Sequence, residues 1–139
     1  MATRVILDGR ETPVLFEKTL PKITARELQA FEKKLGFALP ADYRAFLLAY
    51  NGGRPTVGWV TGRDDDPNTP YAYGDAVSVL FGLGKVPEWA RLRAPSEMDW
   101  ELPPRTLFIA EDAGGNMFAL ECEGKNLVRF VDHESGDPV

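Results

Sequence analysis

The sequence predicts an α+β fold in which N-terminal amphipathic helices pack on a mainly antiparallel sheet within a single domain. Two helical patterns come early, and the apolar pattern changes to a period of two after Val57. The last three strand-like runs are joined by turns too short for parallel crossovers, which favours antiparallel pairing. A chain of 139 residues with 44% apolar residues is typical of one domain with its own core.

The segment before the helices, residues 1–20, contains two strand-like runs, RVILDG and PVLFEK. Gly9 and Pro13 separate them, and the pattern allows either a hairpin or an irregular N-terminal arm.

The first helix is predicted to begin after Thr24, because Thr24 and Glu27 have the spacing of a capping box. Ile23 and Leu28 have the spacing of a hydrophobic staple around the same cap. Gly36 is expected to end this helix in the left-handed conformation that glycine adopts without strain.

The second helix is predicted to begin at Pro40, whose ring presets a helical φ. Asn51 and Gly52 are expected to end it, since both residues tolerate a left-handed backbone. Two helices joined by so short a link should lie as a packed corner or hairpin.

The rest of the chain is read mainly as strands and turns. Residues 62–75, GRDDDPNTPYAYGD, are predicted to form a surface loop, and a short helix is expected within residues 88–93, limited by Pro87 and Pro95. Strands are predicted at residues 57–62, 76–82, 106–112, 116–122 and 127–133.

The net charge of −5 is unevenly distributed. Residues 1–54 carry nine Lys and Arg against six Asp and Glu, whereas residues 55–139 carry seven against fifteen. This balance argues against a nucleic-acid binder and suits a basic protein partner, although from charge alone a solvated, solubility-giving surface is the favoured explanation. We also expect a cytoplasmic protein, because the N-terminus MATRVILDGRE has no apolar signal segment and no apolar run approaches a membrane span.

The sequence contains no recognisable catalytic or metal-binding motif, and we expect neither a cofactor nor a metal. His133 is the only histidine, and Cys122, the only cysteine, stands in no nucleophile motif. The run Asp64, Asp65 and Asp66 lacks the spaced ligands of a calcium loop, so a solvated loop is the simpler interpretation.

Aromatic residues gather around the irregular, acidic middle of the chain. They are Trp59, Tyr71, Tyr73, Trp89 and Trp100. Aromatic side chains are enriched at binding hot spots, and core packing is the alternative, favoured for Trp59 in a predicted strand. Tyr71 and Tyr73 lie in the predicted loop, where exposure is more plausible.

Two blocks of this sequence resemble the SUKH superfamily (Smi/Knr-type domains), and together they span about residues 23–134. The first is ITARELQAFEKKLGFALPADYRAFLLAYNGGRP, and the second combines LFIAEDAGGNMFALE with VRFVDHE. Val131 departs from the pattern, because the family often has Trp there. The residues that carry the resemblance are Leu35, Gly36, Leu39, Pro40, Tyr43, Phe46, Asn51, Gly52, Gly53, Asp112, Gly114, Gly115, Asn116, Asp132, His133 and Glu134.

The resemblance implies a sheet flanked by helices and no catalytic residues. It further implies a cytosolic immunity protein that binds and neutralises the effector domain of a polymorphic toxin, often a nuclease. The candidate contacts with such a basic toxin domain are Asp64, Asp65, Asp66, Tyr71 and Tyr73. The alternatives are a regulatory or scaffolding domain without a toxin partner and, third, a small enzyme that would have to use His133.

Overall fold

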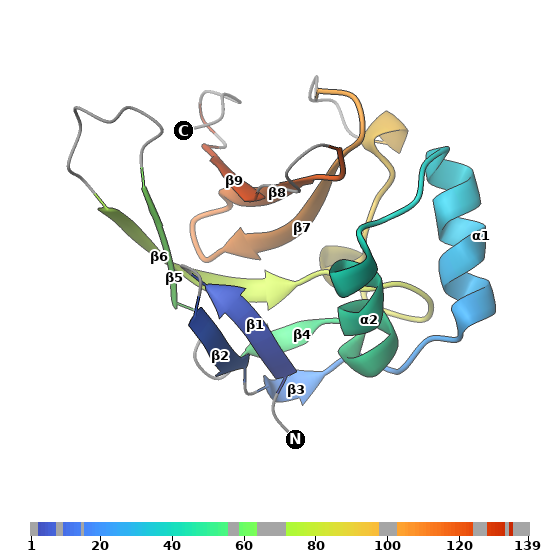
Figure 1. Ribbon diagram of the computed structural model, residues 1–139, viewed down its shortest axis with the longest axis horizontal. Helices are drawn as coiled ribbons and strands as arrows, with labels where there is room; N and C mark the ends of the chain where they lie inside the picture. Colours follow the sequence, from blue (N-terminus) through green and yellow to red (C-terminus); the bar gives the residue numbers. More distant parts are fainter. Residues whose placement is uncertain are drawn as a thin grey trace.

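The computed structural model describes the backbone of residues 3–7, 10–14, 16–55, 59–63, 72–97, 103–123, 128–132 and 134. Side chains are described for residues 19–55, 77–97, 103–123, 128–132 and 134. Within these ranges the protein combines two α-helices with an antiparallel sheet, as the sequence predicts (Figure 1). No helix in the described ranges is long and apolar enough to cross a membrane.

Helix α1 (Ala25–Leu35) begins and ends where its local signals place it. The Glu27 amide donates to Thr24 Oγ1 over 3.2 Å, and the Thr24 amide donates to Glu27 Oε1 over 3.3 Å, which completes the capping box. Gly36 closes the helix with a φ of 85°, and its amide donates to the Glu32 carbonyl. Leu28 and Phe31 form the buried face of the helix.

Helix α2 (Ala41–Tyr50) follows Pro40 and ends at Asn51, whose φ of 58° is left-handed. Tyr43, Phe46 and Tyr50 stack in succession along this helix, with neighbouring ring centroids 6.1 Å apart. The two helices lie next to each other on one side of the sheet (Figure 1). The predicted packing of the two helices against each other is therefore confirmed.

The main sheet has the order β3-β4-β6-β7-β8-β9, with every pairing antiparallel and β5 paired only to β6. The strands are β3 (Phe16–Thr19), β4 (Gly53–Pro55), β5 (Trp59–Arg63), β6 (Ala72–Leu80), β7 (Thr106–Asp112), β8 (Met117–Glu121) and β9 (Val128–Val131). A separate antiparallel hairpin is formed by β1 (Thr3–Leu7) and β2 (Arg10–Val14). The N-terminal segment therefore forms a hairpin followed by an edge strand.

Two predicted boundaries were wrong. Strand β6 begins at Ala72 and pairs with β5 as far as Arg63, so the connection between them is shorter than the predicted loop of residues 62–75. The expected helix within residues 88–93 is one short 3-10 helix, η1 (Glu88–Ala90). After η1 the backbone becomes extended, with φ −86° and ψ 126° at Arg91, and a second short 3-10 helix, η2 (Pro95–Glu97), follows.

The core lies between the helices and the sheet. It combines Leu28, Phe31 and Leu47 of the helices with Val79, Leu107 and Ala119 of the strands. Leu28, Leu47 and Leu107 have no exposed surface. Burial of a Leu side chain contributes on the order of 2 kcal/mol, so this layer fixes the helices against the sheet.

Candidate functional site

The Asn51-Gly52-Gly53 run, which the sequence predicts as a helix stop, also joins three parts of the backbone. The side chain of Asn51 is completely buried. Its Nδ2 donates to the carbonyls of Pro21 and Leu83, and its Oδ1 accepts from the Leu83 amide, each over 2.8 Å. Asn51 therefore connects the end of α2 to the chain before α1 and to the chain after β6.

Two glycines make this close approach sterically feasible. A Cβ atom on Gly82 would lie 2.1 Å from the Asn51 carbonyl oxygen. A Cβ atom on Gly52, whose φ is 105°, would lie 2.5 Å from the Leu80 carbonyl oxygen. Since both neighbours are backbone atoms, neither position accommodates a larger residue without moving the main chain.

The second signature block forms the turn between β7 and β8. Asp112 is buried, and its Oδ1 accepts from the amides of Gly114 and Asn116 over 2.9 and 2.8 Å. Its Oδ2 accepts from Nδ2 of Asn116 over 2.9 Å. Gly115 supplies the left-handed residue of the turn, with a φ of 89°. Asp112 thus fixes the β7–β8 hairpin in the way Asx side chains stabilise turns.

Several other signature residues within the described ranges also make structural contacts. Leu39 is buried in the core, and its amide donates to Glu32 Oε2 over 2.7 Å. Leu35, Tyr43 and Phe46 pack against the core from a half-buried position. After β9, Asp132 Oδ1 accepts from the Glu134 amide over 2.8 Å. These residues position the helices and turns of the domain.

Of the candidate toxin contacts, Asp64, Asp65, Asp66 and Tyr71 lie outside the described residues. The backbone of Tyr73 lies in β6, opposite Gly62 of β5, instead of in the loop that the sequence predicts. His133 also lies outside the described residues. The assignment of these residues to a partner surface stays a prediction.

A cavity of about 140 Å³ lies elsewhere, between the 89–94 segment and the β7–β8 hairpin. Its lining residues are Phe81, Trp89, Arg91, Arg93, Phe108, Glu111 and Met117.

One wall of the cavity is built by alternation along the extended segment that follows η1. Ala90, Leu92 and Ala94 are buried, with exposed fractions of 2% or less. Trp89, which precedes them, and Arg91 and Arg93, which lie between them, line the cavity. The segment is held to the end of β6 because the Gly82 amide donates to the Ala90 carbonyl and the Leu92 amide to the Gly82 carbonyl, each over 2.8 Å. A period of two thus directs Trp89, Arg91 and Arg93 to the same side.

The opposite wall depends on a β-bulge in β7. Met117 and Ala119 lie two residues apart on β8, and their partners on β7 are Glu111 and Phe108, which lie three residues apart. The register shift between Phe108 and Ala110 supplies the extra residue. Because side chains alternate along a strand, only this bulge brings Phe108 and Glu111 to one face. Glu111 is thereby placed among the residues that line the cavity.

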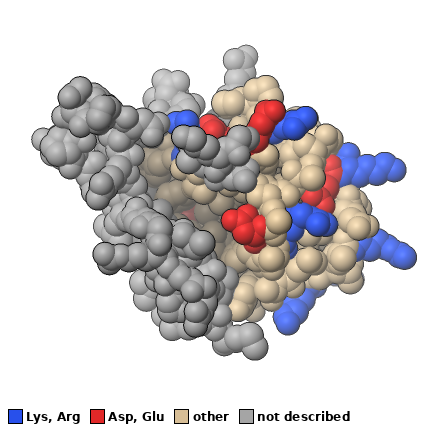
Figure 2. All heavy atoms as spheres, in the orientation of Figure 1, with Lys and Arg blue, Asp and Glu red and all other residues tan. Residues whose placement is uncertain are grey.

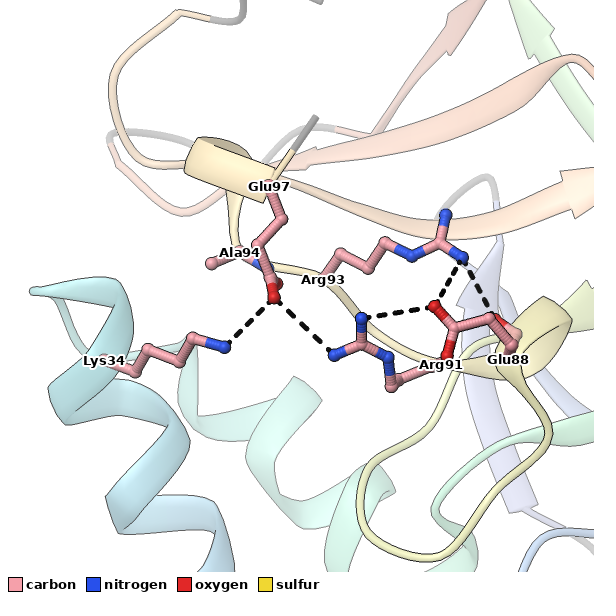
Figure 3. A network of polar contacts seen from close by, with 6 residues as sticks. All are labelled: Lys34, Glu88, Arg91, Arg93, Ala94 and Glu97. Carbon is pink, nitrogen blue, oxygen red and sulfur yellow. Dashed lines mark hydrogen bonds and ion pairs between the residues drawn. The ribbon is translucent and has the colours of Figure 1, made fainter. Parts of the chain in front are cut away.

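The two arginines are held by carboxylates that do not line the cavity (Figure 3). Glu88 Oε1 accepts from Arg91 NH2 and Arg93 NH2 over 3.3 and 3.2 Å. Glu97 Oε1 lies 3.6 Å from Arg91 NH1 and accepts from Lys34 Nζ over 3.1 Å. The pKa of each carboxyl is lowered, for Glu88 chiefly by its hydrogen bond with Arg91 and for Glu97 chiefly by the Ala94 amide. Lys34 thus connects this network to α1.

Trp89 stands at the rim of the cavity with 49% of its surface exposed. The guanidinium carbon of Arg54 lies 4.9 Å from the centroid of its ring, a cation–π contact. In Figure 2, the Lys and Arg side chains of the described surface project mainly from the side on which α1 lies. An exposed Trp beside arginines is the composition typical of binding hot spots.

Glu111 is the residue in the cavity whose protonation is most sensitive to its surroundings. Partial burial raises the pKa of its carboxyl, the neighbouring charge of Asp112 raises the pKa further, and Arg93 opposes both. Within the described part of the chain, the Glu111 carboxylate has no hydrogen-bond or ion-pair partner.

The chemistry of Cys122 argues against its use as a nucleophile. Burial raises the pKa of its thiol to about 11, so very little thiolate exists at neutral pH. Burial likewise raises the pKa of Tyr43, which lies near Cys122. Among the described residues no group of three or more His, Cys, Asp or Glu side chains is arranged to hold a metal ion.

Trp89 is one of the aromatic residues that gather in the acidic middle of the sequence, whereas no motif predicted Arg91, Arg93 or Glu111 as site residues. The signal available was the alternation of large and small residues in WARLRA, which indicates an extended strip with one buried face. Glu111 carries no such local signal, because a bulge places it.

The family model of the SMI1/KNR4 family (SUKH-1) matches residues 22–138 of this chain. No curated protein and no solved structure matches the chain significantly. The matched region contains both helices, strands β4 to β9 and all the signature residues described above. The chain therefore belongs to the SMI1/KNR4 (SUKH-1) family.

Proposed function

We propose that this protein is a cytosolic immunity protein that binds the effector domain of a polymorphic toxin and neutralises it. The observation that carries the proposal is membership of the SMI1/KNR4 (SUKH-1) family, over most of the chain. Domains of this family resemble the immunity proteins of toxin systems, and the proposal takes the role from that resemblance, since the signature motifs themselves define the fold.

Two features support a protein partner. Trp89, Arg91 and Arg93 surround a concave surface, and exposed Trp and Arg side chains dominate the binding energy of many protein interfaces. The acidic balance of residues 55–139 would accelerate encounter with a basic effector domain such as a nuclease. In this proposal Asp64, Asp65, Asp66, Tyr71 and Tyr73 contribute contacts to that domain.

The proposal is tested by affinity purification of the tagged protein from its native cell and identification of the chain that co-purifies. A toxin C-terminal domain whose activity is blocked by the purified protein would support an immunity role. A host regulator or metabolic enzyme as the stoichiometric partner would contradict it and favour a regulatory or scaffolding role.

The contribution of the acidic run is tested separately, once the partner is in hand. The variant Asp64→Lys/Asp66→Lys should slow association at low salt by roughly tenfold, since steering depends on long-range charge. A matched control reverses two carboxylates of exposed residues elsewhere, Glu123→Lys/Glu134→Lys. Equal association rates for the two variants would refute a specific contribution from the acidic run.

A further inference from the structure

The cavity beside Trp89 combines an apolar floor with polar groups whose bonding capacity is only partly used. Phe81, Phe108 and Met117 supply apolar surface, and the charged lining from the described residues consists of two guanidinium groups and one carboxylate. A small concave site with a few converging polar groups is the usual form of a recognition pocket.

The unused capacity lies mainly with hydrogen-bond donors. Arg93 uses only its NH2 group, which donates to the carbonyl and to Oε1 of Glu88 over 3.2 Å each. Within the described residues, its other N–H groups have no acceptor. The Nε of Arg91 is buried and likewise lacks a hydrogen-bond partner in the described part of the structure. Because the Nε of Arg91 is closed to solvent, the remaining N–H groups of Arg93 are the donors that an acceptor from a ligand would satisfy.

The geometry of the network keeps these donors available. Glu88 and Glu97 bind the guanidinium groups, yet neither carboxylate lines the cavity. Lys34 and the Ala94 amide hold Glu97 in turn, the latter over 2.7 Å (Figure 3). Supporting contacts of this kind fix a recognition group before its ligand arrives. Arg91 and Arg93 are thus oriented in advance.

We propose that this cavity receives the carboxylate of one Asp or Glu side chain of the protein partner, bound by Arg91 and Arg93, while the residue next to it packs against Trp89. The inference rests on the proposed function only in taking the partner to be a protein. The planar fork of a guanidinium matches a carboxylate, and such charge-assisted bonds are about twice as strong as neutral ones.

Glu111 selects between this ligand and its competitors. A cationic side chain would have to lie beside the two guanidinium groups that line the cavity, whose charges Glu88 and Glu97 offset in part. A phosphate group would bring close to two negative charges against Glu111, whereas a carboxylate brings one. One proton shared between Glu111 and the entering carboxylate removes their repulsion, as in other close carboxyl pairs.

The test uses the purified full-length protein and three capped peptides, acetyl-Leu-Glu-Leu-amide and its Gln and Lys counterparts. Binding is followed by NMR at the indole N–H of Trp89 and the Nε–H groups of the arginines. The Glu peptide should produce saturable shifts, and the Gln and Lys peptides should bind at least about tenfold more weakly, since a charge-assisted pair contributes at least 1.4 kcal/mol.

Three variants separate this proposal from general charge effects. Arg93→Gln should weaken binding of the Glu peptide about tenfold, while Arg105→Gln, which removes a guanidinium that contacts Glu123 on the surface, should leave it unchanged. Glu111→Gln should keep or strengthen binding. A folded spectrum of each variant shows that the change is local.

The pH dependence provides an independent readout. Glu111 has three neighbours that bear on its charge: Arg93 of the 89–94 segment, Asp112 next to it in β7, and the uncharged Met117 of β8. Binding of the Glu peptide should strengthen as the pH is lowered toward the ordinary pKa of the peptide carboxylate, about 4.3, because burial raises the pKa of Glu111 and its protonation removes the repulsion of the bound carboxylate. In Glu111→Gln this dependence should disappear.

The proposal is overturned if the Lys peptide binds best, if Glu111→Gln abolishes binding, or if no peptide produces a saturable shift. Each of these results leaves the co-purification test of the immunity role unaffected, because a toxin domain would then bind elsewhere on the protein. Conversely, peptide binding that follows the predicted pattern supports the pocket whichever protein co-purifies.

Discussion

Replacing Asn51 by alanine should destabilise the protein by about 3–5 kcal/mol. The substitution removes three hydrogen bonds of 2.8 Å and leaves the Pro21 carbonyl and both backbone groups of Leu83 without this partner. An unsatisfied buried group is unfavourable by about 1–3 kcal/mol, and some relaxation is expected at each. Alanine in the left-handed conformation adds about 1 kcal/mol to the loss of stability. The loss is a large part of the stability of a typical domain.

Urea unfolding of the purified variants measures this effect, provided that the slope of the transition is unchanged. Asn51→Gly is the matched control, because it removes the same hydrogen bonds and tolerates the φ of 58°. The Asn51→Gly variant should therefore be more stable than the Asn51→Ala variant by up to about 1 kcal/mol. A loss below about 1 kcal/mol for Asn51→Ala would refute the assigned role of the side chain, and so would a glycine variant as stable as the parent.

The isosteric Asn51→Asp extends the same test to pH. A carboxylate at this position accepts from the Leu83 amide but cannot donate to the two carbonyls that Nδ2 now contacts. Burial should raise the pKa of the new carboxyl, so the variant should regain stability as the pH falls and the carboxyl takes up a proton. A variant whose stability relative to the parent is constant between pH 5 and pH 8 would contradict this expectation.

Three further predictions follow from the same structure. Gly82→Ala should destabilise the protein by more than about 2 kcal/mol in urea unfolding, because the new Cβ would lie 2.1 Å from a backbone oxygen. Gly36→Ala has open space around its Cβ and should lose only the roughly 1 kcal/mol that a left-handed backbone costs alanine. Equal losses of stability in the two variants would refute the steric reasoning. The raised pKa of Glu111 means that the folded protein holds this proton more tightly than the unfolded chain does. The free energy of unfolding should therefore fall as the pH rises above the unfolded pKa of about 4.5 through the folded value. Glu111→Gln should remove this pH dependence from unfolding curves measured across that window. Alkylation of Cys122 by iodoacetamide should be far slower at pH 8 than alkylation of a free thiol and should accelerate toward its pKa of about 11; rapid modification at pH 7 would show an accessible thiolate.

The parts of the fold that local signals determine could be predicted from the sequence. Thr24 and Glu27 mark a helix start because their capping bonds span only three residues. The β7–β8 turn was visible for the same reason, since Asp112 contacts residues two and four positions further along. Asn51 was correctly predicted to end α2, and that role also depends only on its own backbone.

Neither the Asn51 contacts nor the cavity could be predicted, because both depend on contacts between distant segments. Asn51 reaches residues 30 and 32 positions away, and periodicity gives no information about such distances. Glu111 enters the cavity because of a bulge, which reverses the side on which a regular strand would place it. The strip carrying Arg91 was interpreted as a helix, since its alternation is short and Trp, Ala and Leu also suit a helix.

The polar joint at Asn51 has a consequence for how the domain can diversify. The hydrogen bonds of its side chain go to main-chain atoms of positions 21 and 83, so they do not depend on which side chains those positions carry. Substitutions at the molecular surface can therefore accumulate without loosening the connection between helices and sheet. A scaffold that is held together through its backbone can carry many different surfaces on the same fold.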